Sequence, residues 1–183
     1  MNKYIVNVND IYYTLLLYDN VWYAPEHESV QNLMKLIYQY KTYINNVIAL
    51  DIGCGTGILS IFVSKCGAKS VVAIDINKRA VECTKYNVEK NNIKNIIVEE
   101  KNLNNDFYQQ FDIIVANLSN NDQIENFNNI YKYMHSNSLL FITWEKTSII
   151  QPLNLYIKHY QIIDYINGND YDSYVLKLKN KDG

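Results

Sequence analysis

The sequence contains a single arginine, Arg79, among its 17 basic side chains, and the formal net charge is −2. Proteins that bind nucleic acids generally carry a basic surface stripe that is rich in arginine. The composition therefore argues against a large nucleic-acid-binding surface. A local patch of lysines remains compatible with it.

Cysteine is also scarce, and long apolar runs are absent. Cys54, Cys66 and Cys83 are odd in number and show no C-x-x-C spacing. This pattern fits neither a disulfide framework nor a zinc site, and it is typical of a reducing compartment. The chain also has no apolar stretch of the length of a signal peptide or a membrane span. We therefore expect a cytoplasmic protein without a bound metal.

Most of the chain alternates short apolar runs with stretches of helical periodicity. The apolar runs are of the kind that forms buried parallel strands, with helices between them. Two later, partly alternating runs are typical of an antiparallel pair. This order predicts an α/β fold, a doubly wound and mostly parallel seven-stranded sheet of Rossmann-like type. The predicted strands are 47–52, 70–76, 95–100, 111–118, 138–145, 160–166 and 173–179, and the helices are 57–67, 77–92 and 122–137.

Residues 1–46 have a different character, because they are rich in aromatic side chains. Pro25 and Glu26 predict the start of a helix. A segment of this size cannot hold a core of its own, so we expect a helical lid segment packed onto a domain formed by residues 47–183. Its aromatic residues would either line a substrate cleft or anchor the segment on the core. They are Tyr12, Tyr13, Tyr18, Trp22 and Tyr23.

The stretch "LDIGCGTGILSIF" places three glycines in the turn from the first parallel strand into the next helix. Ligands of open parallel sheets bind at the carboxyl ends of the strands, and glycine lets a ligand contact the main chain. A dinucleotide-binding fingerprint would need glycine at position 58, where Ile58 stands, and the G-K-[ST] ending of a phosphate loop is missing. These departures argue against a nicotinamide dehydrogenase.

Two acidic residues narrow the ligand further. Asp51 stands two residues before the first glycine, where a negative charge would repel a pyrophosphate but suit an ammonium or a sulfonium group. Asp75 ends the next predicted strand, about 20 residues further on, where an acid accepts hydrogen bonds from ribose hydroxyls. A ribose at one end and a cationic amino acid at the other describe S-adenosylmethionine. We predict this compound as the cofactor.

"LDIGCGTGILS" followed by "VVAIDIN" resembles the first and second motifs of the class I S-adenosylmethionine-dependent methyltransferases. The resemblance extends over roughly residues 20 to 145. It implies that Asp75 holds the ribose, that Ile76 lies against the adenine, and that the glycine loop holds the methionine part. Cys54 would contribute only its backbone, so we assign it no redox role. The loop set comprises Asp51, Gly53, Cys54, Gly55 and Gly57.

Many members of this class carry an aspartate after the third strand that binds the adenine amine. Here Asn102, followed by Leu103, holds that position, and its side-chain carbonyl can accept the same hydrogen bond. A shift in the predicted register would bring Glu99 or Glu100 there instead. The resemblance therefore implies that Asn102 and Leu103 complete the cofactor site.

The acceptor would lie at the end of the fourth predicted strand, which reads "FDIIVANLSNND". Methyltransferases that act on base amines often have N-P-P-Y or D-P-P-Y there, and this chain has neither proline. The strand is instead similar to that of the ribosomal-protein lysine methyltransferases, and "YAPEHESVQNLMKLI" resembles their upstream segment through His27. The resemblance implies a catalytic role for Asn117 in orienting the cofactor or an acceptor amine. The alternative is an asparagine that caps the next turn.

Other polar residues have weaker functional interpretations. His27 is either a base or acceptor contact, or a structural histidine. Ser119 is interpreted as local turn chemistry, and His135 and His159 as structural residues in helix-like segments. Protein arginine methyltransferases share "GCGTGILS" but need two glutamates after the fourth strand, and this chain supplies only Glu125, inside a predicted helix.

These observations predict an S-adenosylmethionine-dependent methyltransferase, whose favoured acceptor is a protein side-chain amine. RNA is the next candidate as a substrate, and a small molecule follows it. Methylation of a protein or an RNA is compatible with the participation of a partner chain. The unusual "NLSN", together with Asn102 in place of an acid, leaves a second reading open. In that reading the chain is a non-catalytic subunit that only binds the cofactor.

Overall fold

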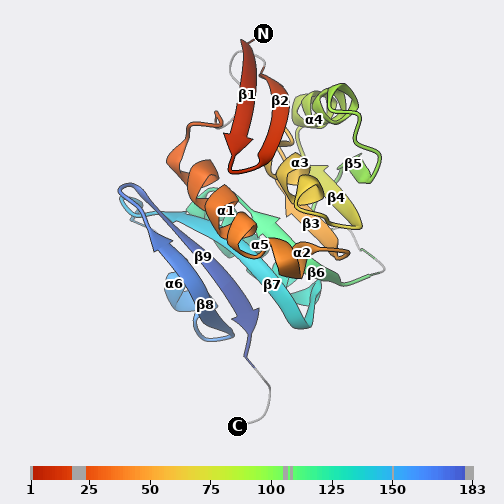
Figure 1. The fold of residues 1–183 in the computed structure, drawn as a ribbon. Coiled ribbons are helices and arrows are strands. Elements are labelled where there is room, and N and C mark those ends of the chain that lie inside the picture. Colours follow the sequence, from red (N-terminus) through yellow and green to blue (C-terminus); the bar gives the residue numbers. More distant parts are fainter. Residues whose placement is uncertain (1, 18–23, 105–106, 108, 150, 180–183) are drawn as a thin grey trace.

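The computed structural model describes residues 2–17, 24–104, 107, 109–149 and 151–179. Its centre is a seven-stranded sheet with the order β5-β4-β3-β6-β7-β9-β8, shown in Figure 1. Strands β3 to β7 run parallel, and β9 pairs antiparallel with β7 and β8. The doubly wound, mostly parallel fold is therefore confirmed. The strands are β3 (Ile48–Ile52), β4 (Ser70–Asp75), β5 (Ile96–Glu100), β6 (Phe111–Ala116), β7 (Met134–Glu145), β8 (Tyr160–Asn167) and β9 (Tyr171–Leu178).

Helices cover both faces of this sheet (Figure 1). Successive residues of a strand point to opposite faces, so Val115 of β6 joins one core and Ile114 joins the other. Both faces are buried, which is why the parallel strands are apolar almost throughout. α1 and α3 pack on the first core, and α5 and α6 pack on the second. The helices are α1 (Glu28–Gln39), α2 (Lys41–Ile44), α3 (Ile58–Lys65), α4 (Lys78–Lys90), α5 (Asn120–Lys132) and α6 (Leu153–Tyr156).

Side-chain caps determine where two of these helices begin. The Asn77 side chain accepts the Arg79 N–H at 2.9 Å and starts α4, and the Ser119 hydroxyl accepts the Asp122 N–H at 3.2 Å and starts α5. Such caps satisfy backbone donors that have no partner within the helix. Ser119 thus has the local structural role that its interpretation as turn chemistry expected, and it also lines the cavity described below.

The helix predicted over 122–137 is too long at its carboxyl end. α5 ends at Lys132, and residues from Met134 onward already belong to β7, because Met134 pairs with Phe111 of β6. His135 therefore lies on a strand, with its Nε2 3.1 Å from Oδ1 of Asp112. His159 lies in the turn between α6 and β8 and not in a helix.

The amino-terminal segment is helical only in part, so the expectation of a helical lid over residues 1–46 is wrong for its first third. β1 (Asn2–Val8) and β2 (Ile11–Leu17) form an antiparallel hairpin, with Asn9 at a positive φ of 54° in the turn. The reason is an alternation with period 2 that places every second side chain on the core. The division of the chain at residue 46 stays a prediction.

The hairpin packs against α3 and α4, and Tyr13 fixes it there. The Tyr13 side chain is buried, and its hydroxyl donates a hydrogen bond to the Ile58 carbonyl at 3.0 Å. Tyr12, by contrast, is 60% exposed. Tyr13 therefore anchors the segment on the core. Tyr18, Trp22 and Tyr23 lie outside the described residues.

A second anchor yields a test of the hairpin's attachment. The Asn91 side chain accepts the Thr14 N–H at 3.0 Å and donates to the Thr14 carbonyl at 2.6 Å. We expect Asn91→Ala to lower the free energy of unfolding by about 1–3 kcal/mol and to speed exchange of the Thr14 amide, because both backbone groups lose their partner. Urea unfolding and amide hydrogen exchange measure the two effects. Glu89→Ala, at an exposed position near the end of α4, which Asn91 caps, is the control. Equal stability of the two variants would contradict this anchor.

Candidate functional site

A cavity of about 550 Å³ opens at the carboxyl ends of the parallel strands. Its volume lies within the range of roughly 300–1,000 Å³ that is usual for small-molecule sites. Most residues that were predicted from the sequence line this one cavity. They are Asp51, Gly53, Cys54, Gly55, Asp75, Ile76, Asn102, Leu103 and Asn117.

The loop after β3 takes a backbone conformation that favours glycine. Gly53, Gly55 and Gly57 have φ values of 69°, 56° and 80°. A Cβ atom at Gly53 would collide with the Leu118 side chain. Gly57 lies outside the cavity lining and begins α3, where a Cβ atom would come within 2.8 Å of Thr84. The first two glycines thus border the cavity, and the third starts the helix.

Asp51 is a buried carboxylate beneath this loop. Its side chain is 2% exposed and accepts a hydrogen bond from the Ser60 hydroxyl. Burial raises the pKa of Asp51 to about 6, although the hydrogen bond from Ser60 acts in the opposite direction, and the nearby negative charge of Asp75 raises it further. A positively charged group in the cavity would offset this cost. The geometry therefore fits a cationic ligand.

Asp75 ends β4 and connects the two loops that border the cavity. Its carboxylate accepts the N–H of Gly55 at 3.0 Å and the N–H of Asn77 at 2.8 Å. The next residue, Ile76, is 74% exposed at the edge of the cavity, which leaves a large apolar surface available to a ligand. A carboxylate next to an exposed apolar side chain suits a ribose that is joined to a flat base.

The far wall of the cavity comes from the segment after β5. Leu103 is buried, whereas Asn102 is exposed and its side chain accepts the Asn104 N–H at 2.9 Å. Lys101 also lines the cavity, with its Nζ 3.9 Å from the centre of the Phe107 ring. Glu99 and Glu100 are not part of the lining. The register that was used for Asn102 is therefore the one that brings a side chain to the cavity.

Asn117 lies at the opposite end, directly after β6. Its Nδ2 donates to the Ser29 hydroxyl at 3.1 Å, and its Oδ1 accepts from the Thr143 hydroxyl at 3.3 Å. Asn117 is therefore held between α1 and β7. The cap of the following helix is provided by Ser119 instead.

His27 contacts this end of the site indirectly. Its Nδ1 lies 2.8 Å from the Ser29 hydroxyl, and its ring lies edge-on to Tyr171 at 4.9 Å. Burial lowers the pKa of His27, despite the nearby charges of Glu28 and Asp170. The structure thus places His27 behind Ser29, outside the cavity lining.

The sequence-based prediction missed several lining residues. Val30 comes from α1 and Leu118 from the turn after β6, and three polar side chains come from the first turns of α5. These three side chains are Asp122, Glu125 and Asn126. Their spacing of three and four residues puts them on one helix face, which is a signal that the sequence contained. Glu125 lies inside the helix as predicted, yet its side chain reaches the cavity.

The charge of the lining is mainly negative. Four carboxylates line the cavity, and Lys101 is the one cationic side chain among its described residues. Cys54 is buried, and burial raises the pKa of its thiol, so the loop contributes backbone and no reactive sulfur. Among the described residues, no group of three His, Cys, Asp or Glu side chains could hold a metal ion. The carboxylates are those of Asp51, Asp75, Asp122 and Glu125.

Solved structures with this fold include several methyltransferases. The structure of a ribosomal protein L11 methylase from Lactobacillus delbrueckii subsp. bulgaricus superposes with a TM-score of 0.78 at 22% identity, over 87% of this chain and 82% of that one. A tRNA m1G37 methyltransferase of M. jannaschii gives 0.75 at 17% identity, over 98% of this chain and 57% of that one. Together with the family match described next, these similarities define a class I S-adenosylmethionine-dependent methyltransferase domain.

Within that class the family is specific. The ribosomal protein L11 methyltransferase (PrmA) family matches residues 25–145, so the chain belongs to this family. The relative from Thermosipho africanus is 31% identical over 70% of this chain and 48% of its own length. The one from Thermoanaerobacter pseudethanolicus is 38% identical over 63% and 39%. The chain therefore spans about half the length, or less, of the curated relatives that it matches.

Asp51 yields a prediction with a defined pH dependence. Its pKa in the folded chain is about 6, above the ordinary value of 3.8. Protonation of Asp51 in the folded chain therefore stabilises the fold. This contribution is fully present below about pH 4 and is lost as the pH rises through 6. We expect Asp51→Asn to be more stable than wild type by up to about 3 kcal/mol near pH 8, and by about half of that near pH 5. Urea unfolding of the ligand-free proteins measures this difference. A difference that does not change with pH would contradict the assignment.

Proposed function

We propose that this chain transfers a methyl group from S-adenosylmethionine to a side-chain amine of a ribosomal protein. One observation supports this most strongly. A single cavity is bordered by the glycine loop and Asp75 at one side and by Asn117 at another. Its wall thus combines features that suit the cofactor with a polar side chain held in place at the end of β6. The family membership and the names of the relatives point to the same activity.

The cofactor would supply a methyl group on a positively charged sulfur. In this proposal the loop backbone and Asp51 hold its methionine part, and Asp75 accepts hydrogen bonds from its ribose. Ile76 and Leu103 enclose the adenine, and Asn102 contacts the edge of that base. The mainly negative lining, with Asp51 buried beneath it, favours a sulfonium over a phosphate-bearing ligand.

Asn117 is the residue we assign to the acceptor. Methyl transfer by direct displacement needs little covalent help, so the main task of the protein is to hold the amine in line with the methyl group. The two hydrogen bonds of Asn117, to Ser29 and from Thr143, fix its side chain in one orientation. Its carbonyl oxygen, which faces Thr143, retains a lone pair for an amine N–H.

The alternatives receive less support. An RNA substrate is suggested by the structural similarity to tRNA methyltransferases, but at 17% identity that similarity concerns the fold alone. The single arginine and the acidic cavity do not favour a polyanion.

In the described structure no helix is long and apolar enough to cross a membrane. A ribosomal-protein substrate supports a cytoplasmic location for the proposed activity, and the cysteine pattern supports it too.

The cofactor site can be tested without knowledge of the acceptor. We expect Asp75→Ala to weaken binding of S-adenosylhomocysteine by about 10- to 100-fold, because a hydrogen bond to a charged group contributes about 1.5–3 kcal/mol. Isothermal titration calorimetry measures the dissociation constant. Glu100→Ala removes a carboxylate from the neighbouring strand that does not line the cavity, and it should bind like wild type. An unchanged dissociation constant for Asp75→Ala would refute the assignment.

The transfer reaction is tested with S-adenosylmethionine that carries a labelled methyl group. We expect label on ribosomal protein L11, supplied alone and in intact ribosomes, and a loss of about 100-fold in kcat for Asn117→Ala with an unchanged cofactor affinity. Asn121→Ala, an exposed position outside the cavity lining, is the matched control. Label on RNA alone would favour the RNA alternative. Bound cofactor without label in any fraction would favour the non-catalytic subunit.

A further inference from the structure

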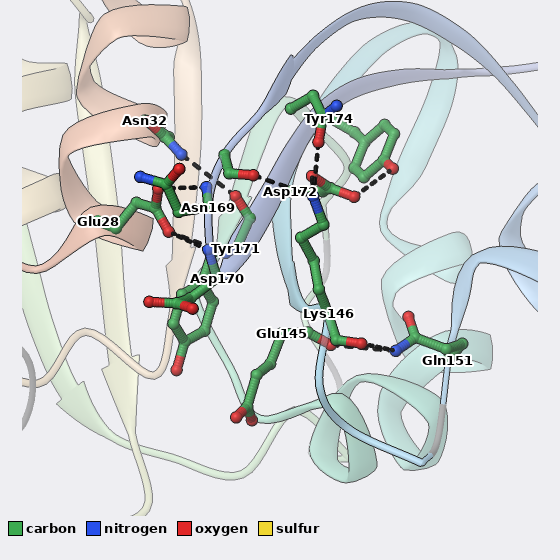
Figure 2. Close-up of polar contacts among 12 residues, drawn as sticks. Glu28, Asn32, Glu145, Lys146, Gln151, Asn169, Asp170, Tyr171, Asp172 and Tyr174 are labelled. Carbon is green, nitrogen blue, oxygen red and sulfur yellow. Dashed lines mark hydrogen bonds and ion pairs between the residues drawn. The ribbon is translucent and has the colours of Figure 1, made fainter.

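The first residue of α1 is bound by a turn that lies far from it in the sequence. Both carboxylate oxygens of Glu28 accept backbone hydrogen bonds from the turn between β8 and β9 (Figure 2). The donors are the N–H groups of Asn169 at 2.6 Å, Asp170 at 2.7 Å and Tyr171 at 2.9 Å. Successive N–H groups that converge in this way form a concave site for an anion. Here the anion is a side chain of the same protein.

The turn is shaped around this carboxylate. A Cβ atom at Gly168 would lie 2.8 Å from Oε1 of Glu28 and would also collide with the Tyr171 carbonyl, so only glycine fits. Asn32, one turn along α1, donates to the Tyr171 carbonyl at 3.3 Å and adds a second bond from the same helix. The turn is therefore matched to the start of α1.

The same turn is also attached to the end of β7. The Lys146 ammonium donates to the Asn167 side chain at 2.7 Å and to the Gly168 carbonyl at 3.0 Å. The adjacent Glu145 backbone exchanges two hydrogen bonds of 3.1 Å with the Asn120 side chain of α5. The start of α1, the hairpin turn, the end of β7 and the start of α5 are thus joined in series.

This series is linked to Asn117 through the start of α1. Ser29, which follows Glu28, is fully buried and accepts the hydrogen bond from Asn117. Val30, the next residue, lines the cavity. A shift of the first turn of α1 would therefore move a partner of Asn117 and a wall of the cavity together. The position of the first turn of α1 depends on the hydrogen bonds between Glu28 and the β8–β9 turn.

We propose that Glu28 is a positioning residue: by binding the β8–β9 turn through its carboxylate, it holds Ser29 in place to orient Asn117 toward the acceptor. This inference rests on the proposed function. Glu28 acts through Ser29 and has no place in the cavity lining itself. Burial raises its pKa, but the three backbone donors together lower it, so the carboxylate stays charged at neutral pH. A charged acceptor makes stronger hydrogen bonds to the N–H groups than a neutral one.

The test compares Glu28→Ala, Glu28→Gln and the control Glu26→Gln, an exposed glutamate two residues earlier. In the L11 methylation assay we expect kcat to fall about tenfold or more in Glu28→Ala, because small displacements at a reacting centre are costly. Glu28→Gln keeps a neutral acceptor and should regain part of that loss, whereas Glu26→Gln should match wild type. The affinity for S-adenosylhomocysteine should stay within about twofold in all three, since the cofactor end is unchanged.

A second readout does not depend on catalysis. The side-chain amide of Asn117 and the backbone amides of residues 169–171 can be observed by NMR in isotope-labelled protein. We expect Glu28→Ala to shift the Asn117 amide signals and to speed exchange at 169–171, and Glu26→Gln to change neither. A wild-type protein that methylates nothing would refute the proposed function, and the NMR signals would still report on Glu28. Unmoved Asn117 signals, or a kcat within twofold of wild type in Glu28→Ala, would overturn the positioning role.

Discussion

The site depends on the connection between the ends of β3 and β4. The Ile74 carbonyl accepts the N–H groups of both Gly53 and Cys54 at 2.9 Å, and the Asp75 carboxylate accepts that of Gly55. Three consecutive backbone donors of the glycine loop are thus bound by two consecutive residues of the neighbouring strand. A loop with left-handed residues would otherwise be costly to hold in one conformation. The parallel pairing of β3 with β4 therefore shapes the backbone that borders the cavity.

The same arrangement introduces a cost that a cationic ligand would offset. Asp51 is buried below the loop, and its carboxylate loses more by desolvation than it regains from Ser60, which is why its pKa is raised. Stability alone would favour a neutral side chain at this position. Retaining the charge makes physical sense where a positive ligand is to be attracted, and active sites commonly exchange stability for function in this way.

The sequence predicted the parts of the structure that depend on neighbours in the chain. Strands β3, β4 and β6 were evident because buried parallel strands are apolar throughout. The glycine-loop end of the cavity was evident because Asp51, Gly53 and Gly55 belong to one short motif. The hairpin of residues 2–17 was not predicted because Ile5 and Tyr12 lie on its exposed face and obscure the alternation of apolar and polar side chains. The contact between Ser29 and Asn117 could not be predicted either. It joins residues 88 positions apart, and only the packing of α1 against β7 and β9 brings them together.

This difference between the two ends of the cavity has a physical consequence. The glycine-loop end is shaped by short-range backbone geometry, whereas the Asn117 side chain is bound by α1 and β7. In our proposal, Glu28 extends this support to a turn that lies 143 residues beyond Glu28 in the chain. The family match ends at residue 145, before that turn begins. The support that we propose for Asn117 therefore includes a hairpin that lies outside the matched region. In this proposal, a change in the hairpin would alter the orientation of Asn117 and leave the glycine loop and its carboxylates undisturbed.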